Sequence, residues 1–130
     1  MNTDIESRAE IETLVIAFYD AVKKDEQIGH YFAHVNWSKH LNIMFDFWEN
    51  ILFYSGTYSG NPMKVHQQIH QLKNLSAKDF DHWINLFCLT VDQLFTGENA
   101  TAIKRRATNI ARVMQQKIMP PSGGNNTFNN

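Results

Sequence analysis

The sequence predicts an all-α fold built as one domain. Apolar residues recur at helical spacing in several long segments, and the alternating patterns or hairpin signals typical of strands are few. The chain has 130 residues, a length that supports a single hydrophobic core. Apolar residues make up 43% of it and aromatic residues 12%, enough to wall a pocket as well as a core. We expect the domain to span 1–119 and the Pro-, Gly- and Asn-rich stretch 120–130 to be a disordered tail.

The first two helices are predicted from apolar stripes. The first stripe consists of Ile11, Leu14, Val15, Phe18 and Val22, and Tyr19 lies beside it. A short aromatic segment follows Gly29, and Asn36 is of the type that caps a helix starting at Trp37. The face of that second helix consists of Trp37, Leu41, Met44, Trp48, Ile51 and Leu52. Both helices are therefore expected to bury one side.

The middle of the chain predicts a loop and a short helix. The stretch 54–60 contains two glycines and has no apolar period, which is typical of a loop. Asn61 and Pro62 then resemble an N-cap and a first helical position. The helix expected from Pro62 to about Leu72 would carry Met63, His66, Ile69 and His70.

Two longer helices are predicted in the last third of the chain. Ser76 and Asp79 have the spacing of a capping box before a stripe of Phe80, Trp83, Ile84, Phe87, Val91 and Leu94, with an end near Gly97. The last helix is expected from about Asn99 to Ile118. Its inward residues are Ile103, Ala107, Ile110, Met114 and Ile118, and its outward residues include Lys104, Arg105, Arg112 and Lys117.

Charge and cysteine content exclude several classes of function. Twelve basic and thirteen acidic residues leave a formal charge of −1, so nucleic acid and anionic membranes are poor default partners. The single cysteine, Cys88, excludes an internal disulfide and multi-cysteine metal sites, and we expect an inert buried thiol. We find no targeting segment and no run of roughly 18 apolar residues, so a cytoplasmic protein is expected.

Histidines and aromatic residues are the candidates for chemistry, because the sequence has no phosphate-binding glycine loop and no serine elbow. His40 shares a helix face with Met44 and Trp48, so it is expected to point inward. A core histidine bonded to a local carbonyl is the alternative for His40, and a structural role is likewise open for His66. Tyr19 and Trp83 each combine apolar bulk with one hydrogen-bond donor, and each also fits a plain core role.

A metal-binding or interaction module is one hypothesis that the residues alone leave open. His66 and His70 lie one helical turn apart and could chelate a metal together. Further carboxylate ligands would be needed, and the sequence has no Glu-x-x-His motif. The nearest substitute, Asp79 with His82, lies off the apolar stripe of its helix and is expected to face water.

Seven segments occur in an order that resembles a known family. They are Phe18–Val22, Gly29–Phe32, Trp37–His40, Phe47–Trp48, Gly60–His66, Phe80–Phe87 and Arg106–Ala107. Between about residues 8 and 118 this pattern resembles the group III truncated haemoglobins, which are small bacterial globins. The resemblance implies a truncated globin-like helical sandwich around a haem pocket.

The resemblance also implies a role for individual residues. His66 becomes the proximal ligand of the iron of haem b (iron protoporphyrin IX), because it stands at the family's distance after Gly60-Asn61-Pro62, whereas His70 has no role in the pattern. Tyr19, His40 and Trp83 are assigned to the distal side, where they stabilise a bound gas, and His40 is also a candidate sixth ligand of the iron. The expected walls of the pocket, which contact the cofactor, are Phe32, Met44, Trp48 and Trp83.

The function implied by the resemblance is binding of O₂, with NO, CO and peroxide as further ligands. Each distal donor would contribute on the order of 1–3 kcal/mol in a dry pocket. Such a pocket is compatible with detoxification of NO or with a peroxidase-like reaction served by a reductase, and it leaves open whether the chain is an enzyme. A monomer is expected.

Overall fold

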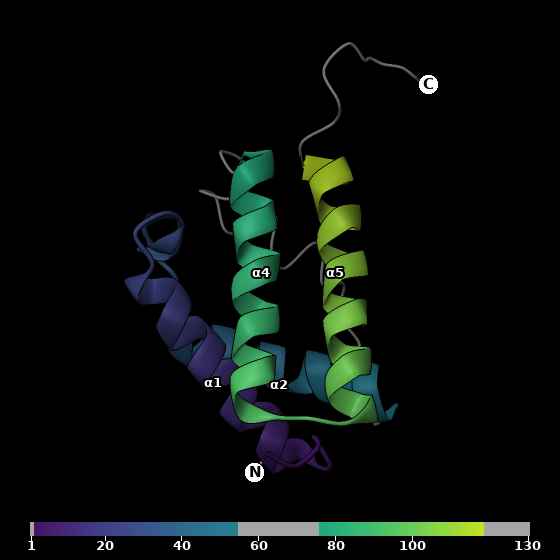
Figure 1. The fold of residues 1–130 in the computed structure, drawn as a ribbon. Coiled ribbons are helices and arrows are strands. Elements are labelled where there is room, and N and C mark those ends of the chain that lie inside the picture. The colour runs from purple at the N-terminus through teal and green to yellow at the C-terminus, as the bar shows by residue number, and fades with distance from the viewer. Residues whose placement is uncertain (1, 55–75, 119–130) are drawn as a thin grey trace.

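Four α-helices and one short 3₁₀ helix form the part of the chain that the structure, a computed structural model, describes: residues 2–54 and 76–118. Their bounds are α1 Arg8–Lys24, η1 Gly29–Phe32, α2 Trp37–Phe53, α4 Ala77–Leu94 and α5 Glu98–Ile118. In Figure 1, α4 and α5 stand side by side and α1 and α2 run across their lower end. Helix α1 packs on α2 and α4, and α5 packs on α4 and α2. The predicted all-α fold is confirmed.

The helices begin at residues that supply a side-chain cap. The Asn36 side chain accepts a hydrogen bond from Lys39 N, and Ser76 and Asp79 form a complete capping box. Both predicted caps are confirmed. Helix α4 ends at Leu94, earlier than the stop expected near Gly97.

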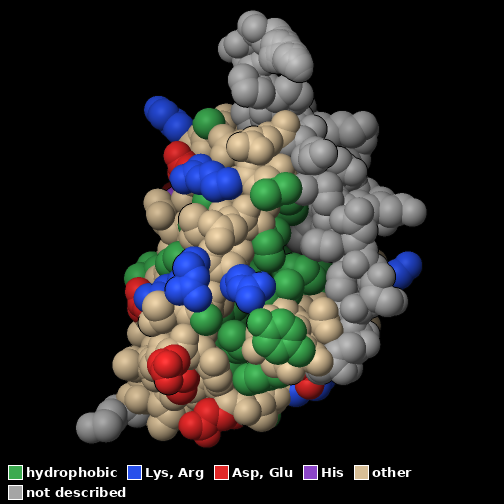
Figure 2. Space-filling model, turned by 90° about the vertical axis from the view of Figure 1, so that its right-hand side faces the viewer, with side chains coloured by type: hydrophobic (Ala, Val, Ile, Leu, Met, Phe, Trp, Pro, Cys, Tyr) green, Lys and Arg blue, Asp and Glu red, His purple; other side chains and the backbone are tan. Residues whose placement is uncertain are grey.

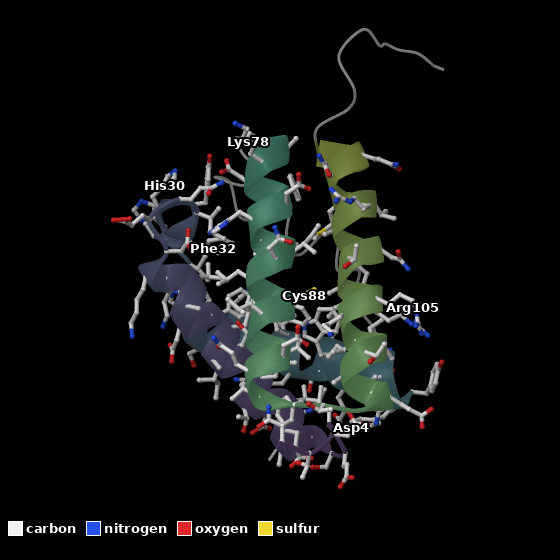
Figure 3. All side chains as sticks on the ribbon, viewed as in Figure 1. Asp4, His30, Phe32, Lys78, Cys88 and Arg105 are labelled. Carbon is white, nitrogen blue, oxygen red and sulfur yellow. The ribbon has the colours of Figure 1, made fainter. Side chains whose placement is uncertain are left out.

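Asp4, in the segment before α1, caps the start of α5. Backbone N–H groups of Asn99 and Ala100 donate to the two carboxylate oxygens of Asp4, over 2.9 and 2.8 Å. Figure 3 shows Asp4 beside the first turn of α5. Gly97 has a φ of +147°, and a Cβ there would collide with the Asp4 side chain. Asp4 therefore caps a helix far along the chain.

The core is centred on aromatic rings from three helices. The Phe18 ring of α1 meets the Phe87 ring of α4 edge-on, with centroids 5.0 Å apart. The Trp48 ring of α2 stacks on Phe87 at 5.2 Å. The whole predicted stripe of α1 is buried: Ile11, Leu14, Val15, Phe18 and Val22. Burying a side chain of this size contributes roughly 1.5–3 kcal/mol, so these contacts hold α1, α2 and α4 together.

The prediction that Asp79 and His82 face water was wrong. Asp79 is only 8% exposed, and its carboxylate accepts hydrogen bonds from Tyr31 Oη and Gln27 Nε2. His82 is half-buried against Asp25. Both residues lie off the apolar stripe, as expected, but the corner between α1 and η1 packs on that side of α4.

Three arginines of α5 stand on the surface, as predicted. Arg105, Arg106 and Arg112 are exposed, and Figure 2 shows basic side chains over this side of the molecule with apolar side chains beside them. Within 2–54 and 76–118, no helix combines the length and apolar character needed to cross a bilayer. The helix expected from Pro62 to about Leu72 and the tail expected at 120–130 lie outside the described residues.

Candidate functional site

An apolar pocket lies between α1, α2, α4 and α5. It has about 390 Å³ of empty space, counting the part open to solvent. Its lining is Phe18, Tyr19, Met44, Phe47, Trp48, Trp83, Ile84, Phe87, Ala107, Ile110 and Met114. Hydrogen-bond donors in these side chains are confined to the tyrosine hydroxyl and the two indole N–H groups. Such a lining suits an apolar group that needs few polar contacts.

Tyr19 is the phenol of this pocket. It belongs to α1 and is 2% exposed, so the position that sequence periodicity put beside the apolar stripe is in fact part of the core. Its ring lies 5.2 Å from Trp37 and 6.3 Å from Phe32, measured between centroids. Burial raises the pKa of the Tyr19 hydroxyl well above its ordinary value. The hydroxyl is protonated at neutral pH, as that of any tyrosine with an ordinary or raised pKa is, and can donate a hydrogen bond.

His40 lies behind Tyr19. It is buried in α2, one turn before Met44, as its place on the apolar face predicted. Its ring meets the Tyr19 ring at 80°, with centroids 5.1 Å apart, and the Trp37 ring at 5.6 Å. His40 is not among the residues that line the pocket. Its contacts support the tyrosine ring from the α2 side.

Trp83 approaches the pocket from α4. Its indole lines the cavity, its Nε1 atom is buried, and its ring centroid lies 6.2 Å from that of Phe18. The Phe18 ring also lies 4.9 Å from the Tyr19 ring, so one phenyl ring contacts both candidate donors. Periodicity assigned them to different helices, and the fold brings them to one cavity.

The candidate wall residues divide into two groups. Met44 and Trp48 line the pocket. Phe32 does not: it is buried in η1, where its ring contacts Tyr19 and Trp37, and it is labelled in Figure 3. His66 and His70 lie outside the described residues, and within the described ranges no three His, Cys, Asp or Glu side chains are arranged to hold a metal ion.

Sequence reasoning did not single out most of the remaining wall. The lining residues it left unassigned are Phe18, Phe47, Ile84, Phe87, Ala107, Ile110 and Met114. Six of them lie on predicted apolar stripes, and Phe47 belongs to one of the segments that resemble the truncated haemoglobins. A stripe shows that a side chain points inward, but it does not distinguish the wall of a cavity from a filled core.

Comparison with known proteins identifies the fold family. The chain matches the model of the family described as bacterial-like globin over residues 3–117. It belongs to the bacterial-like globins. This globin is 28% identical over 119 residues to the group 3 truncated hemoglobin ctb of Campylobacter jejuni. The matched region covers 87% of this chain and 91% of that protein.

The structural comparison agrees with the sequence comparison. The crystal structure of the group III truncated hemoglobin from Campylobacter jejuni matches this globin with a TM-score of 0.77 and 26% identity. The match covers 95% of this chain and 100% of that one. The resemblance drawn from the seven sequence segments and the predicted truncated globin fold are both confirmed.

Membership of a globin family implies haem binding and is consistent with the binding of diatomic gases. The described pocket fits such a group. Its walls come from four helices and are almost wholly apolar, as a macrocycle with apolar faces requires. Tyr19 and Trp83 add a phenol hydroxyl and an indole N–H to this lining.

Proposed function

We propose that this bacterial-like globin binds haem b and, at the haem iron, O₂, with NO, CO and peroxide as further ligands. The observation that carries the proposal is the apolar pocket in which Tyr19 and Trp83 supply buried donors from two different helices. Bound haem supplies the reversible gas binding and the redox chemistry that no side chain of the chain can provide.

His66 is the residue proposed to hold the iron. Its support is its place in the Gly60–His66 segment, one of the segments that resemble the group III truncated haemoglobins, together with the family match across residues 3–117. His70, one turn further on, has no role in the proposal.

The three distal candidates have unequal parts in the proposal. Tyr19 is the main donor, because its buried phenol lines the pocket and the rings of Phe32 and Trp37 restrict its orientation. Trp83 is the second donor. Each hydrogen bond to a gas ligand in this pocket would contribute about 1–3 kcal/mol. His40 supports Tyr19 and is the proposed alternative sixth ligand of the iron.

The apolar walls have a separate part. Met44 and Trp48 line the α2 side of the pocket with a thioether and an indole. They are the walls that we propose contact the cofactor. Phe32 closes the far side of Tyr19. Together they keep water from competing for the donor groups, which strengthens each hydrogen bond to the ligand.

Haem loading tests the proposal directly. The purified chain supplied with haem is expected to develop an intense Soret band, and His66→Ala is expected to lose the spectrum of proximal histidine ligation. His70→Ala is the matched control and should keep that spectrum. A wild-type spectrum in His66→Ala would contradict the assignment. Tightly bound zinc or non-haem iron without porphyrin would favour a haem-free module on His66 and His70.

The proposed physiological role is detoxification of NO or a peroxidase-like reaction, carried out by a cytoplasmic monomer that receives electrons from a reductase. Donors that hold O₂ also hold a peroxide, so the pocket serves both reactions. Stopped-flow mixing of the haem-loaded, O₂-equilibrated protein with NO, beside turnover of peroxide, separates them. Fast consumption of NO with slow peroxide turnover favours the first role, and the reverse favours the second.

A further inference from the structure

Five polar side chains join the corner between α1 and η1 to the first turns of α4. We call Asp25, Gln27, Tyr31, Asp79 and His82 the polar clasp. Nε2 of His82 lies 2.7 Å from Oδ2 of Asp25. Tyr31 Oη donates to Oδ2 of Asp79 over 2.8 Å, and Gln27 Nε2 donates to Oδ1 over 3.0 Å. The clasp therefore joins the corner to α4 through two carboxylates, Asp25 on the corner and Asp79 on α4.

Both carboxylates of the clasp are also held by backbone groups. Asp25 accepts hydrogen bonds from the N–H groups of Gln27 and Ile28, and Asp79 accepts one from Ser76. Burial alone would raise the pKa of each carboxyl. The side-chain hydrogen bonds from His82 to Asp25 and from Gln27 and Tyr31 to Asp79, together with these backbone ones, outweigh it, so both pKa values are lowered. A carboxylate fixed by several donors is a rigid anchor for its partner on the other element.

The residues next to the clasp are Trp83, which lines the pocket, and Phe32, which packs against Tyr19. His82 directly precedes Trp83 on α4, and Tyr31 directly precedes Phe32 in η1. The Phe32 ring lies 6.3 Å from the Tyr19 ring. The clasp thus fixes the turn of α4 that carries one donor and the η1 segment that packs against the other.

We propose that the polar clasp, through the contact of His82 with Asp25, positions the Trp83 indole relative to Tyr19 and thereby sets how fast a gas ligand leaves the pocket. The part about ligand release rests on the proposed function, and the part about position does not. His82 and Asp25 are positioning residues, since neither lines the pocket. A merely structural role would lower stability without moving the indole.

The position of the indole can be read from the indole N–H signal of Trp83 in a ¹H–¹⁵N spectrum of the purified full chain, assigned with Trp83→Phe. His82→Ala is expected to shift or broaden that signal more than the indole signal of Trp48. His82→Gln retains a donor toward Asp25 and is expected to restore it in large part. If His82→Ala does not fold, Asp25→Asn is read in the same way.

Asp81→Asn is the matched control. Asp81 neighbours His82 on the same turn of α4, but it forms an exposed ion pair with Arg112 of α5, at 2.7 Å. Its loss should leave the Trp83 signal in place. A Trp83 signal that moves as far in Asp81→Asn as in His82→Ala would overturn the proposal, because any change in this turn would then have the same effect.

Ligand release tests the second half. In haem-loaded protein, His82→Ala is expected to release O₂ roughly fivefold faster than wild type, the effect of weakening one hydrogen bond. Asp81→Asn should release it at the wild-type rate. A His82→Ala protein that melts earlier but keeps both the Trp83 signal and the rate of release would overturn the proposal. If the wild-type chain takes up no haem, the proposed function fails, whereas the spectra still test the position of Trp83.

Discussion

The rings of Tyr19 and His40 pack edge to face, with centroids 5.1 Å apart, although they belong to different helices. His40 meets the tyrosine ring without lining the pocket itself. The phenol is enclosed on its other sides by Phe32 and Trp37. The hydroxyl of Tyr19 is therefore carried by a ring that neighbouring aromatic groups hold in one orientation.

Removing the Tyr19 hydroxyl should speed the release of O₂ from the haem-loaded protein. Tyr19→Phe keeps the ring contacts and deletes one donor, so we expect release to become roughly tenfold faster with little change in melting temperature. Trp83→Phe deletes the indole donor and should act in the same direction. The rates follow from stopped-flow displacement of O₂ by CO. Wild-type rates in both variants would exclude the proposed donors.

The sequence predicted the helices better than it predicted their polar contacts. The stripe from Ile11 to Val22 and the caps at Asn36 and Ser76 are local patterns, and the structure has them. Asp79 and His82 were misplaced because their partners come from the α1–η1 corner, more than forty residues away in the sequence. Helical periodicity contains no information about which polar face a distant segment will cover.

The candidate site, too, was predicted only in part. Tyr19, Met44, Trp48 and Trp83 were each singled out, and the structure brings all four to one pocket. Phe32 was expected in the wall but stands behind Tyr19, because the depth at which an aromatic residue is buried depends on the packing of η1 against α1. The roles proposed for these residues depend on the family resemblance and stay predictions.

Asp4→Ala should destabilise the fold through the start of α5. The carboxylate accepts hydrogen bonds from Asn99 N and Ala100 N, so its removal leaves two helix donors without their cap. We expect a loss of about 1–2 kcal/mol in the free energy of unfolding, measured with urea. Glu6→Ala, an exposed carboxylate two positions on, is the control. Equal stability of the two variants would show that the cap contributes nothing.

Gly29→Ala should also be destabilising, for a steric reason. A Cβ at this position would lie 2.8 Å from the carbonyl oxygen of Lys23 and 2.9 Å from that of Val22. Both contacts are with backbone at the end of α1, so η1 must move away. We expect a cost of roughly 1–3 kcal/mol, seen as a lower melting temperature. The control is Gln116→Ala, at an exposed position of α5, which should melt close to wild type. A Gly29→Ala protein with the wild-type melting temperature would mean that η1 shifts freely.

Cys88 should react slowly with alkylating reagents in the folded protein. Cys88 is half-buried, not fully buried as expected. This partial burial raises the pKa of its thiol, with a smaller contribution from the charge of Asp92, and the charge of Lys104 and a hydrogen bond with Thr108 offset only part of this. We expect native Cys88 to react with iodoacetamide roughly tenfold more slowly than free glutathione at neutral pH, because less thiolate is present. The same chain in urea is the control and should react at the ordinary rate. If native Cys88 reacted as fast as the chain in urea, the prediction of an inert thiol would be wrong.

Acid should destabilise the protein in part through Asp79. Burial would raise the pKa of this carboxyl, but hydrogen bonds from Gln27, Ser76 and Tyr31 outweigh it and lower the pKa in the folded state. A carboxyl with a lowered native pKa binds protons more readily when the chain is unfolded. Its contribution is therefore fully present above the unfolded pKa, near 3.9, and is lost as pH falls through the native value.

Replacing the carboxyl should remove that dependence. Asp79→Asn is expected to lose roughly 1–2 kcal/mol at neutral pH and to show a shallower fall in the free energy of unfolding below about pH 4. Tyr31→Phe keeps the charge and deletes one of the hydrogen bonds, so its acid slope should lie between those of Asp79→Asn and wild type. Urea unfolding at a series of pH values measures both. An Asp79→Asn protein with the wild-type slope would show that the acid sensitivity arises from other carboxylates.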